Sequence, residues 1–217
     1  MASPYLKAAL ITIAVAALGF FFIAQLDAMR AGELQGSVDE LLFQAQSERI
    51  VYTYFQTMGN STSEYCSYIY GSAQQKTSRI YDLAERIRYY EKSNLVNAEY
   101  NRIRDQYYLS NAELYLNARA AAKYCGASPY TTILFFYKVK EDCPECRAQG
   151  ELLDKVVSGN PGVRVFAFPS DTGYAFIDVF LTRHGITQVP SIVINDKVVL
   201  QGLHDEAEID KYVGSAG

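Results

Sequence analysis

The stretch Thr132-Ile-Leu-Phe-Phe-Tyr-Lys-Val-Lys-Glu-Asp-Cys-Pro-Glu-Cys146 decides how the C-terminal part of this chain folds. Its first half, residues 132–137, is a continuous run of β-favouring residues, as expected for a strand that is buried on both faces. A short loop over 138–142 leads to the sequence Cys143-Pro-Glu-Cys146. Pro144 suits the first position of a helix, where its missing N–H is not needed. The stretch therefore predicts a buried strand, a loop and a helix that begins at the cysteine pair.

The residues that follow continue an alternation of helices and strands. The helix that begins at the cysteines should end at Gly159-Asn-Pro161. Five further elements are expected, in chain order a strand at 163–168, a helix at 174–184, two strands at 189–194 and 197–200 around an Asn195-Asp196 turn, and a helix at 206–213. Residues 131–214 therefore predict an α/β domain with the order β-α-β-α-β-β-α.

This order resembles the thioredoxin superfamily, because Cys-x-x-Cys stands where the first strand enters the first helix and Val189-Pro190 opens the third strand. The resemblance covers residues 131–214 and none of the chain before them. The form Cys-Pro-x-Cys is similar to that of glutaredoxins and bacterial periplasmic thiol oxidases. The resemblance to the superfamily implies a thiol–disulfide oxidoreductase. In such an enzyme the Pro190 peptide bond is cis and the Val189 backbone pairs with an extended substrate chain.

The position of the two cysteines indicates their chemistry. Cys143 stands at a helix N-terminus, where unpaired N–H groups and the helix dipole stabilise the thiolate that attacks a disulfide. Cys146 lies one turn further on the same face, so it can resolve the mixed disulfide formed at Cys143. Pro144 and Glu145 complete the motif. The alternatives are an inert structural disulfide or half of a zinc site, and the lack of a second closely spaced pair disfavours metal. No metal or cofactor is predicted.

Two departures from thioredoxins limit what the resemblance implies. Thioredoxins have a tryptophan before the first cysteine and a buried acid in the preceding strand, and Asp142 and Tyr137 stand at those places here. The base that deprotonates Cys146 is therefore not identified, although Glu141 is a candidate substitute. The Pro-x dipeptide favours an oxidant or isomerase over a reductant.

The partners of such an enzyme would be protein thiols or disulfides. An oxidant would also need a quinone-linked membrane partner, and a reductant would need a membrane carrier of electrons. One alternative function is a docking or assembly protein that uses the α/β domain as a non-catalytic scaffold. Another is a glutathione-dependent glutaredoxin, which residues 201–206 disfavour because they offer little positive charge for a glutathione carboxylate.

Residues 37–126 have the patterns of a helical module. Ser37-Val-Asp-Glu40 and Ser61-Thr-Ser-Glu64 are capping boxes that begin helices. Two longer stretches then repeat apolar residues every three or four positions, with a break in the second at Ser110-Asn111. Ser93-Asn94 supplies the turn between them, so we expect an antiparallel helical hairpin.

Cys66 and Cys125 lie on the apolar stripes of the two hairpin helices. Folding the hairpin about its turn places them opposite each other, with Ala73 and Ala118 as a neighbouring small pair. These alanines would let the helices approach within the about 7 Å between Cα atoms that a disulfide requires. We therefore predict a structural Cys66–Cys125 disulfide. The alternative is two separate buried thiols, since unpaired cysteine packs as a small apolar residue.

The segment from Ala8 to Leu26 contains 19 residues and no charge. A helix of this length spans about 30 Å, the thickness of a bilayer core, so the segment predicts a membrane anchor. A cleaved signal peptide is the alternative, with its cleavage site between Ala24 and Ala28. Charge predicts the orientation, since Lys7 precedes the segment and one arginine among four acids follows it. Residues 1–7 should therefore be cytoplasmic, with the linker 27–36 and both later domains outside, where disulfides persist.

Composition bounds the remaining possibilities. The chain of 217 residues has room for one domain with accessories or for two small domains, and its 49% hydrophobic residues suffice for a packed core. The net charge of −4 argues against a nucleic-acid partner, because no surplus of cations is available to neutralise phosphates. The chain has 18 tyrosines and no tryptophan, and tyrosine packs well at half-buried helix faces.

Overall fold

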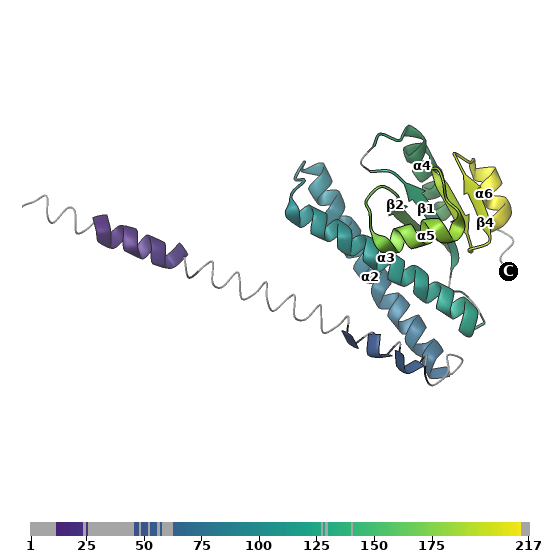
Figure 1. Ribbon diagram of the computed structural model, residues 1–217, viewed down its shortest axis with the longest axis horizontal. Coiled ribbons are helices and arrows are strands. Elements are labelled where there is room, and N and C mark those ends of the chain that lie inside the picture. The colour runs from purple at the N-terminus through teal and green to yellow at the C-terminus, as the bar shows by residue number, and fades with distance from the viewer. Residues whose placement is uncertain are drawn as a thin grey trace, which may run out of the picture. The chain divides into compact units, whose positions relative to one another are not determined.

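The computed structural model of the chain describes two units, Met1–Asn60 and Ser61–Gly217. The described residues are 12–23, 25, 46–47, 49–51, 53–55, 57, 63–126, 128, 130–139 and 141–213. Figure 1 shows the helices and strands along the chain. The first capping box, residues 37–40, lies outside the described residues.

The first unit is helical wherever it is described. The predicted membrane anchor, residues 8–26, is described at residues 12–23 and at Gln25, all of which are helical. Within the described part of the chain, no helix combines the length and the apolar character needed to cross a membrane.

The second unit begins with a helical hairpin. Helix α2 spans Ser63–Lys92 and helix α3 spans Ala98–Tyr124, and the turn between them contains the predicted Ser93-Asn94. The side chain of Asn97 caps α3 by accepting a hydrogen bond from the backbone N–H of Tyr100 at 2.9 Å. The cap explains why the second helix starts here.

Helix α3 runs without interruption through Ser110-Asn111, where the apolar repeat has its gap, as expected for one continuous hairpin helix. Both side chains are buried, and the Asn111 amide donates to the backbone carbonyl of Tyr107 at 2.9 Å. Because the helix itself supplies the partner of this buried amide, a polar residue on the inner face does not end the helix.

The hairpin is joined by a disulfide between Cys66 and Cys125, whose Cα atoms lie 5.7 Å apart. Ala73 and Ala118 are both buried. A salt bridge between Lys76 and Glu113 also crosses from one helix to the other.

The rest of the second unit is an α/β fold around a four-stranded sheet in the order β2-β1-β3-β4. Strand β1 (Thr131–Tyr137) pairs in parallel with β2 (Val163–Pro169) and antiparallel with β3 (Ser191–Ile194), and β4 (Val198–Gln201) pairs antiparallel with β3. The β-α-β-α-β-β-α order is confirmed. Strand β1 lies inside the sheet, and its five central residues are all buried, as its unbroken apolar run predicts.

Successive residues of β1 pack into two separate cores on opposite faces of the sheet. On one face, Ile133 and Phe135 pack with residues of helices α4 (Pro144–Gly159) and α6 (Glu206–Val213). On the other face, Leu134 and Phe136 pack with helix α5 (Ala175–His184) and with the hairpin.

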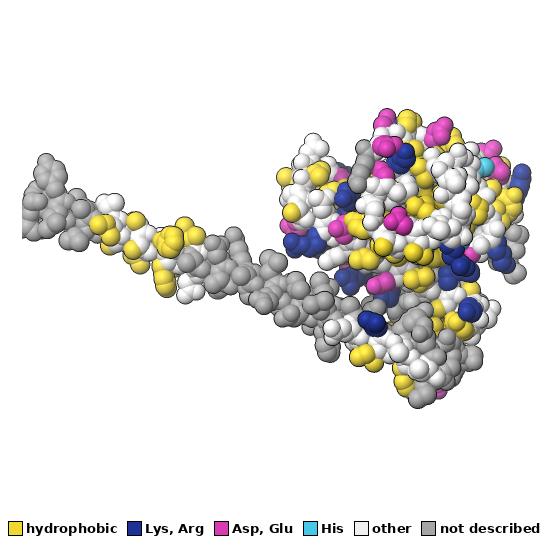
Figure 2. Space-filling view, viewed as in Figure 1, with side chains coloured by type: hydrophobic (Ala, Val, Ile, Leu, Met, Phe, Trp, Pro, Cys, Tyr) yellow, Lys and Arg dark blue, Asp and Glu magenta, His cyan; other side chains and the backbone are white. Residues whose placement is uncertain are grey.

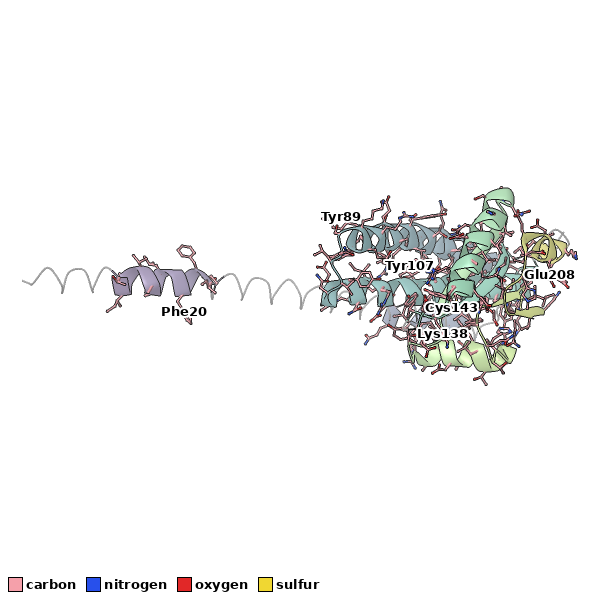
Figure 3. All side chains as sticks on the ribbon, turned by 90° about the horizontal axis from the view of Figure 1, so that it is seen from above. Phe20, Tyr89, Tyr107, Lys138, Cys143 and Glu208 are labelled. Atoms are coloured by element: carbon pink, nitrogen blue, oxygen red, sulfur yellow. A yellow bond between two sulfur atoms is a disulfide. The ribbon has the colours of Figure 1, made fainter. Side chains whose placement is uncertain are left out.

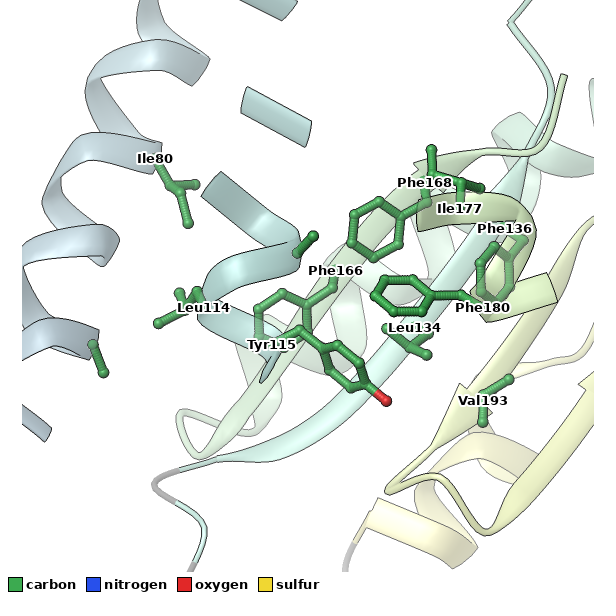
Figure 4. Packing of buried hydrophobic residues seen from close by; sticks show 12 residues of the cluster. Ile80, Leu114, Tyr115, Leu134, Phe136, Phe166, Phe168, Ile177, Phe180 and Val193 are labelled. Atoms are coloured by element: carbon green, nitrogen blue, oxygen red, sulfur yellow. The ribbon is translucent and has the colours of Figure 1, made fainter. Parts of the chain in front are cut away.

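The hairpin belongs to the second of these cores. Figure 4 shows Ile80 and Leu114 of the hairpin in the same cluster as the phenylalanines of the α/β fold. The ring of Tyr115 in α3 meets those of Phe166 and Phe180 edge to face, with centroids 5.7 and 5.4 Å apart. Such aromatic pairs each add about 0.5–1.5 kcal/mol beyond the burial of their area. Helix α3 therefore covers the sheet as α5 does, and fixes the hairpin against it.

Candidate active site

The predicted pair Cys143 and Cys146 forms a disulfide at the start of α4. Cys143 is the N-cap of the helix, and its Sγ accepts a hydrogen bond from the backbone N–H of Cys146 at 3.2 Å. Pro144 occupies the first turn, where no intrahelical hydrogen bond is lost. The helix N-terminus therefore points an N–H group and its dipole at the Cys143 sulfur, which stabilises negative charge there.

The two cysteines differ in exposure. Cys146 is 5% exposed, whereas Cys143 is half-buried, and the neighbouring Glu145 is exposed. A pocket of about 460 Å³ reaches both cysteines, with walls that include Phe135 and Tyr137. An incoming thiolate would therefore reach the Cys143 sulfur more readily than the Cys146 sulfur.

Pro190 lies at the end of the sheet where β1 leads into α4. The Val189–Pro190 peptide bond is cis. Phe136 pairs with Ser191, so Pro190 comes one step further along β3, at the level of Tyr137. The backbone N–H and carbonyl of Val189 form no hydrogen bond with the described residues. They remain available to an extended chain.

The side chain of Gln201 holds the loop that leads to Val189. Its Oε1 accepts hydrogen bonds from the backbone N–H groups of Thr187 and Gln188 at 2.9 and 3.3 Å. Its Nε2 donates to the carbonyl of Gly185 at 3.3 Å. This role could not be predicted from the sequence, because an isolated glutamine near the end of a strand has many possible partners.

Comparison with known proteins finds a family match in the C-terminal part of the chain. The family described as Thioredoxin domain matches residues 138–214. The C-terminal part of the chain is a thioredoxin superfamily domain. The solution structure of an uncharacterized thioredoxin-like protein from Clostridium perfringens is 24% identical, and the match covers 41% of this chain and 72% of that chain with a TM-score of 0.35. The search of curated proteins gave no match.

In this thioredoxin domain, Tyr137 lies where the resemblance places a buried acid. Its ring stacks on Phe135 with centroids 5.4 Å apart, and its hydroxyl lies 3.2 Å from that of Tyr108 in the hairpin. Burial raises the pKa of the Tyr137 phenol above its ordinary value. Tyr137 therefore stays neutral at physiological pH and cannot replace the carboxylate as a base.

Ion pairs engage two of the acidic residues near the thioredoxin-domain cysteines. Lys138 pairs with Glu141, and Arg147 pairs with Asp142 at 2.6 Å. Figure 2 shows acidic and basic side chains interspersed on the visible face of the second unit. The Glu141 carboxylate, predicted as a candidate base, is therefore engaged by a lysine in the disulfide form.

The loop between β1 and the thioredoxin-domain cysteines is fixed by residues that follow β2. Both carboxylate oxygens of Asp171 accept from the backbone N–H of Val139 at 3.1 Å. The backbone N–H of Ser170 donates to the Tyr137 carbonyl at 2.7 Å. Sequence reasoning missed both residues, because an acid in a polar loop is usually a solvated charge.

The described residues contain no group of three histidine, cysteine or acidic side chains arranged to hold a metal ion. The Cys66–Cys125 pair lies in the hairpin and does not line the pocket at Cys143. The structure thus brings together Cys143, Cys146, Pro144 and Glu145 at the start of one helix.

Proposed function

We propose that this protein is a membrane-anchored thiol–disulfide oxidoreductase that exchanges disulfides with protein thiols through Cys143 and Cys146. One observation carries the proposal. The half-buried Cys143 sulfur stands at a helix N-terminus, is bonded to the buried Cys146 sulfur and faces a pocket. An inert structural disulfide has no need for this accessible, helix-stabilised sulfur.

The exchange proceeds in two displacements. A substrate thiolate attacks the Cys143 sulfur, the Cys143–Cys146 bond breaks, and its electron pair leaves on Cys146, which takes up a proton. A second substrate thiolate then attacks the first substrate sulfur and expels Cys143 as a thiolate. The substrate gains a disulfide, and its two electrons remain on the cysteine pair. The same steps in reverse reduce a substrate disulfide.

The helix N-terminus favours Cys143 as the sulfur that leaves or attacks. The N–H of Cys146 already donates to the Cys143 sulfur, and this contact becomes charge-assisted when that sulfur is a thiolate. The Val189 backbone, with its free N–H and carbonyl, is the proposed partner of the extended substrate chain.

The membrane part of the proposal rests on the sequence. The uncharged segment 8–26 would anchor the chain, and the cation before it and the acids after it would place the N-terminus in the cytoplasm. The two disulfides fit an oxidising location outside the cytoplasm. A membrane redox partner would then restore the cysteine pair after each turnover.

Trapping the mixed disulfide tests the proposed chemistry. In Cys146→Ser, a single-cysteine peptide activated as a mixed disulfide should remain attached to Cys143, because the resolving sulfur is gone. Cys143→Ser should form no such adduct and should lose at least about a hundredfold in exchange rate. Equal exchange rates for Cys143→Ser and the wild type would contradict the enzyme and favour a scaffold.

The direction of electron flow follows from one equilibrium measurement. Incubation with defined ratios of reduced and oxidised glutathione, followed by acid quench and thiol labelling, gives the potential of the Cys143/Cys146 couple. A value near that of strong oxidants, about −120 mV, would indicate disulfide formation, and one near −270 mV would indicate reduction.

Protease treatment of intact and permeabilised cells tests the topology. The thioredoxin domain should be digested while the membrane that anchors the chain is still intact. A domain that is protected until this membrane is opened would contradict the proposed orientation.

A further inference from the structure

A second pocket, of about 480 Å³, lies between the helical hairpin and the end of β1. Helices α2 and α3 form most of its wall, and Tyr137 and Val139 of the thioredoxin domain complete it. Tyr107, on the hairpin side of this wall, is labelled in Figure 3 together with Cys143 and Lys138.

The hairpin pocket adjoins the pocket at the cysteines. Tyr137 and Val139 line both of them. A polypeptide whose cysteine reacts at Cys143 would therefore bring its flanking residues to the hairpin pocket. An extended chain advances about 3.3 Å per residue, so a few residues suffice to pass from one pocket to the next.

The charged side chains of the hairpin pocket are Arg88, Arg104 and Glu91. Glu91 already accepts a hydrogen bond from the Tyr100 hydroxyl at 3.0 Å. Neither arginine forms an ion pair within the described part of the chain. The pocket thus offers two positive charges against one negative charge that is already hydrogen-bonded.

Arg104 is held in place without an acidic partner. Its guanidinium lies over the ring of Tyr100, 5.4 Å from the centroid, and its Nε is buried with no hydrogen-bond partner. A buried N–H donor without an acceptor costs stability, and most buried donors in proteins have an acceptor. A carboxylate supplies two acceptor oxygens in the geometry of a guanidinium.

We propose that the hairpin pocket binds an acidic side chain of the substrate polypeptide, a few residues from the cysteine that reacts with Cys143. Arg88 and Arg104 receive the carboxylate. This subsite rests on the proposed exchange function and adds to it a substrate class, namely protein thiols with a nearby aspartate or glutamate. Because the pocket lies on one side of the cysteine pair, it should bind an acidic side chain from only one side of the substrate cysteine.

Paired peptides test the subsite. Each peptide contains one cysteine and either glutamate or glutamine at a single position two to six residues before or after it. The measured quantity is the second-order rate constant with which the peptide thiol reduces the Cys143–Cys146 disulfide of the oxidised full-length protein in a single turnover, in which the peptide sulfurs become a disulfide and the cysteine pair takes up the two electrons. The wild type should prefer glutamate over glutamine by about five- to tenfold at one or two positions on one side, and the preference should shrink in high salt.

Variants assign the preference to the two arginines. Arg88→Gln with Arg104→Gln should bring the ratio of the two rates to about one. Arg88→Gln alone leaves Arg104 on the Tyr100 ring and should reduce the preference partway, which guards against misfolding of the double variant. Arg102→Gln is the matched control, since Arg102 is an exposed residue of α3 outside the pocket, and it should retain the preference.

The results that would contradict the subsite differ from those that would contradict the exchange function. Equal rates for every glutamate and glutamine pair in the wild type, or a preference that survives in the double variant, would overturn the subsite while exchange continues. The same holds if Arg102→Gln removes the preference. A wild-type protein that exchanges with no peptide of either kind would overturn the exchange function, and the subsite with it.

Discussion

The hydroxyl oxygens of Tyr108 and Tyr137 lie 3.2 Å apart, so the helical hairpin is hydrogen-bonded to the last residue of the strand that leads into the cysteine pair. Tyr137 also lines the pocket at Cys143. The hairpin is therefore part of the surroundings of the proposed active site. Any change that moves α3 should be transmitted to the residue beside the two sulfurs.

Removing either hydroxyl of this pair should destabilise the protein. We expect Tyr108→Phe and Tyr137→Phe each to lower the free energy of unfolding by about 1 kcal/mol, because each leaves the other hydroxyl without its partner at a partly buried site. The double variant should lose less than the sum, with a coupling of about 0.5–1.5 kcal/mol in urea unfolding. Tyr89→Phe is the control, since Tyr89 is 65% exposed and should change little. Strictly additive losses would show that the two hydroxyls do not interact.

The Cys66–Cys125 disulfide should contribute strongly to stability and little to exchange. Its cysteines are 59 residues apart, and closing a loop of that length stabilises a protein by about 4 kcal/mol in the chain-entropy model. Replacing both by alanine should lower the free energy of unfolding by about that amount, while folded protein keeps its exchange rate within about twofold. Mass mapping under non-reducing conditions gives a direct check. Two free thiols at these positions in the native wild type would contradict the structure.

The elements of the thioredoxin domain could be predicted because their signals are local. The apolar run of β1, the proline after Cys143 and the Asn195-Asp196 turn each identify an element within a few residues. Asn195 and Asp196 have positive φ angles of 50° and 57°, which these two residue types tolerate better than most. The hairpin followed from helical periodicity in the same way.

The docking of the hairpin onto the sheet could not be predicted, because its contacts join residues far apart in the sequence. Tyr115 donates to Asp196 across 81 residues, and Tyr174 donates to Asp105 across 69 residues. In both pairs a tyrosine ring packs in an apolar region while its hydroxyl reaches an acid. The high tyrosine content was visible in the sequence, but it does not specify which acid each hydroxyl meets.

Asp196 is the residue through which the turn between β3 and β4 holds α3. Its carboxylate accepts from the Tyr115 hydroxyl and pairs with Arg119. Asp196→Asn keeps the shape and tolerates the positive φ, so it tests the charge alone. We expect a loss of about 1–2 kcal/mol in the free energy of unfolding, less than for a fully buried pair because Arg119 is partly exposed to solvent.

The control for this prediction is Asp178→Asn, on the exposed face of α5. It should change the free energy of unfolding by less than about 0.5 kcal/mol. If the two variants lose the same amount, the Asp196 carboxylate does not hold the hairpin. Urea unfolding of both variants in parallel decides between these outcomes.

His184 should make the protein less stable in mild acid. Burial lowers the pKa of its imidazole, and the nearby Asp196 carboxylate, 3.6 Å from Nε2, only partly opposes this effect. The unfolded chain, with an ordinary pKa of about 6.5, then binds the proton before the folded protein does. Stability should therefore be unaffected by this group above about pH 7.5 and should fall as the pH drops through 6.5 towards the lower pKa of the folded state.

His184→Gln removes the titration, so its free energy of unfolding should decline less between pH 7.5 and 5 than that of the wild type. Normalising both curves at pH 8, where the imidazole is neutral in both states, separates this slope from the cost of the substitution itself. Parallel curves down to pH 5 would mean that the imidazole binds its proton equally well in both states.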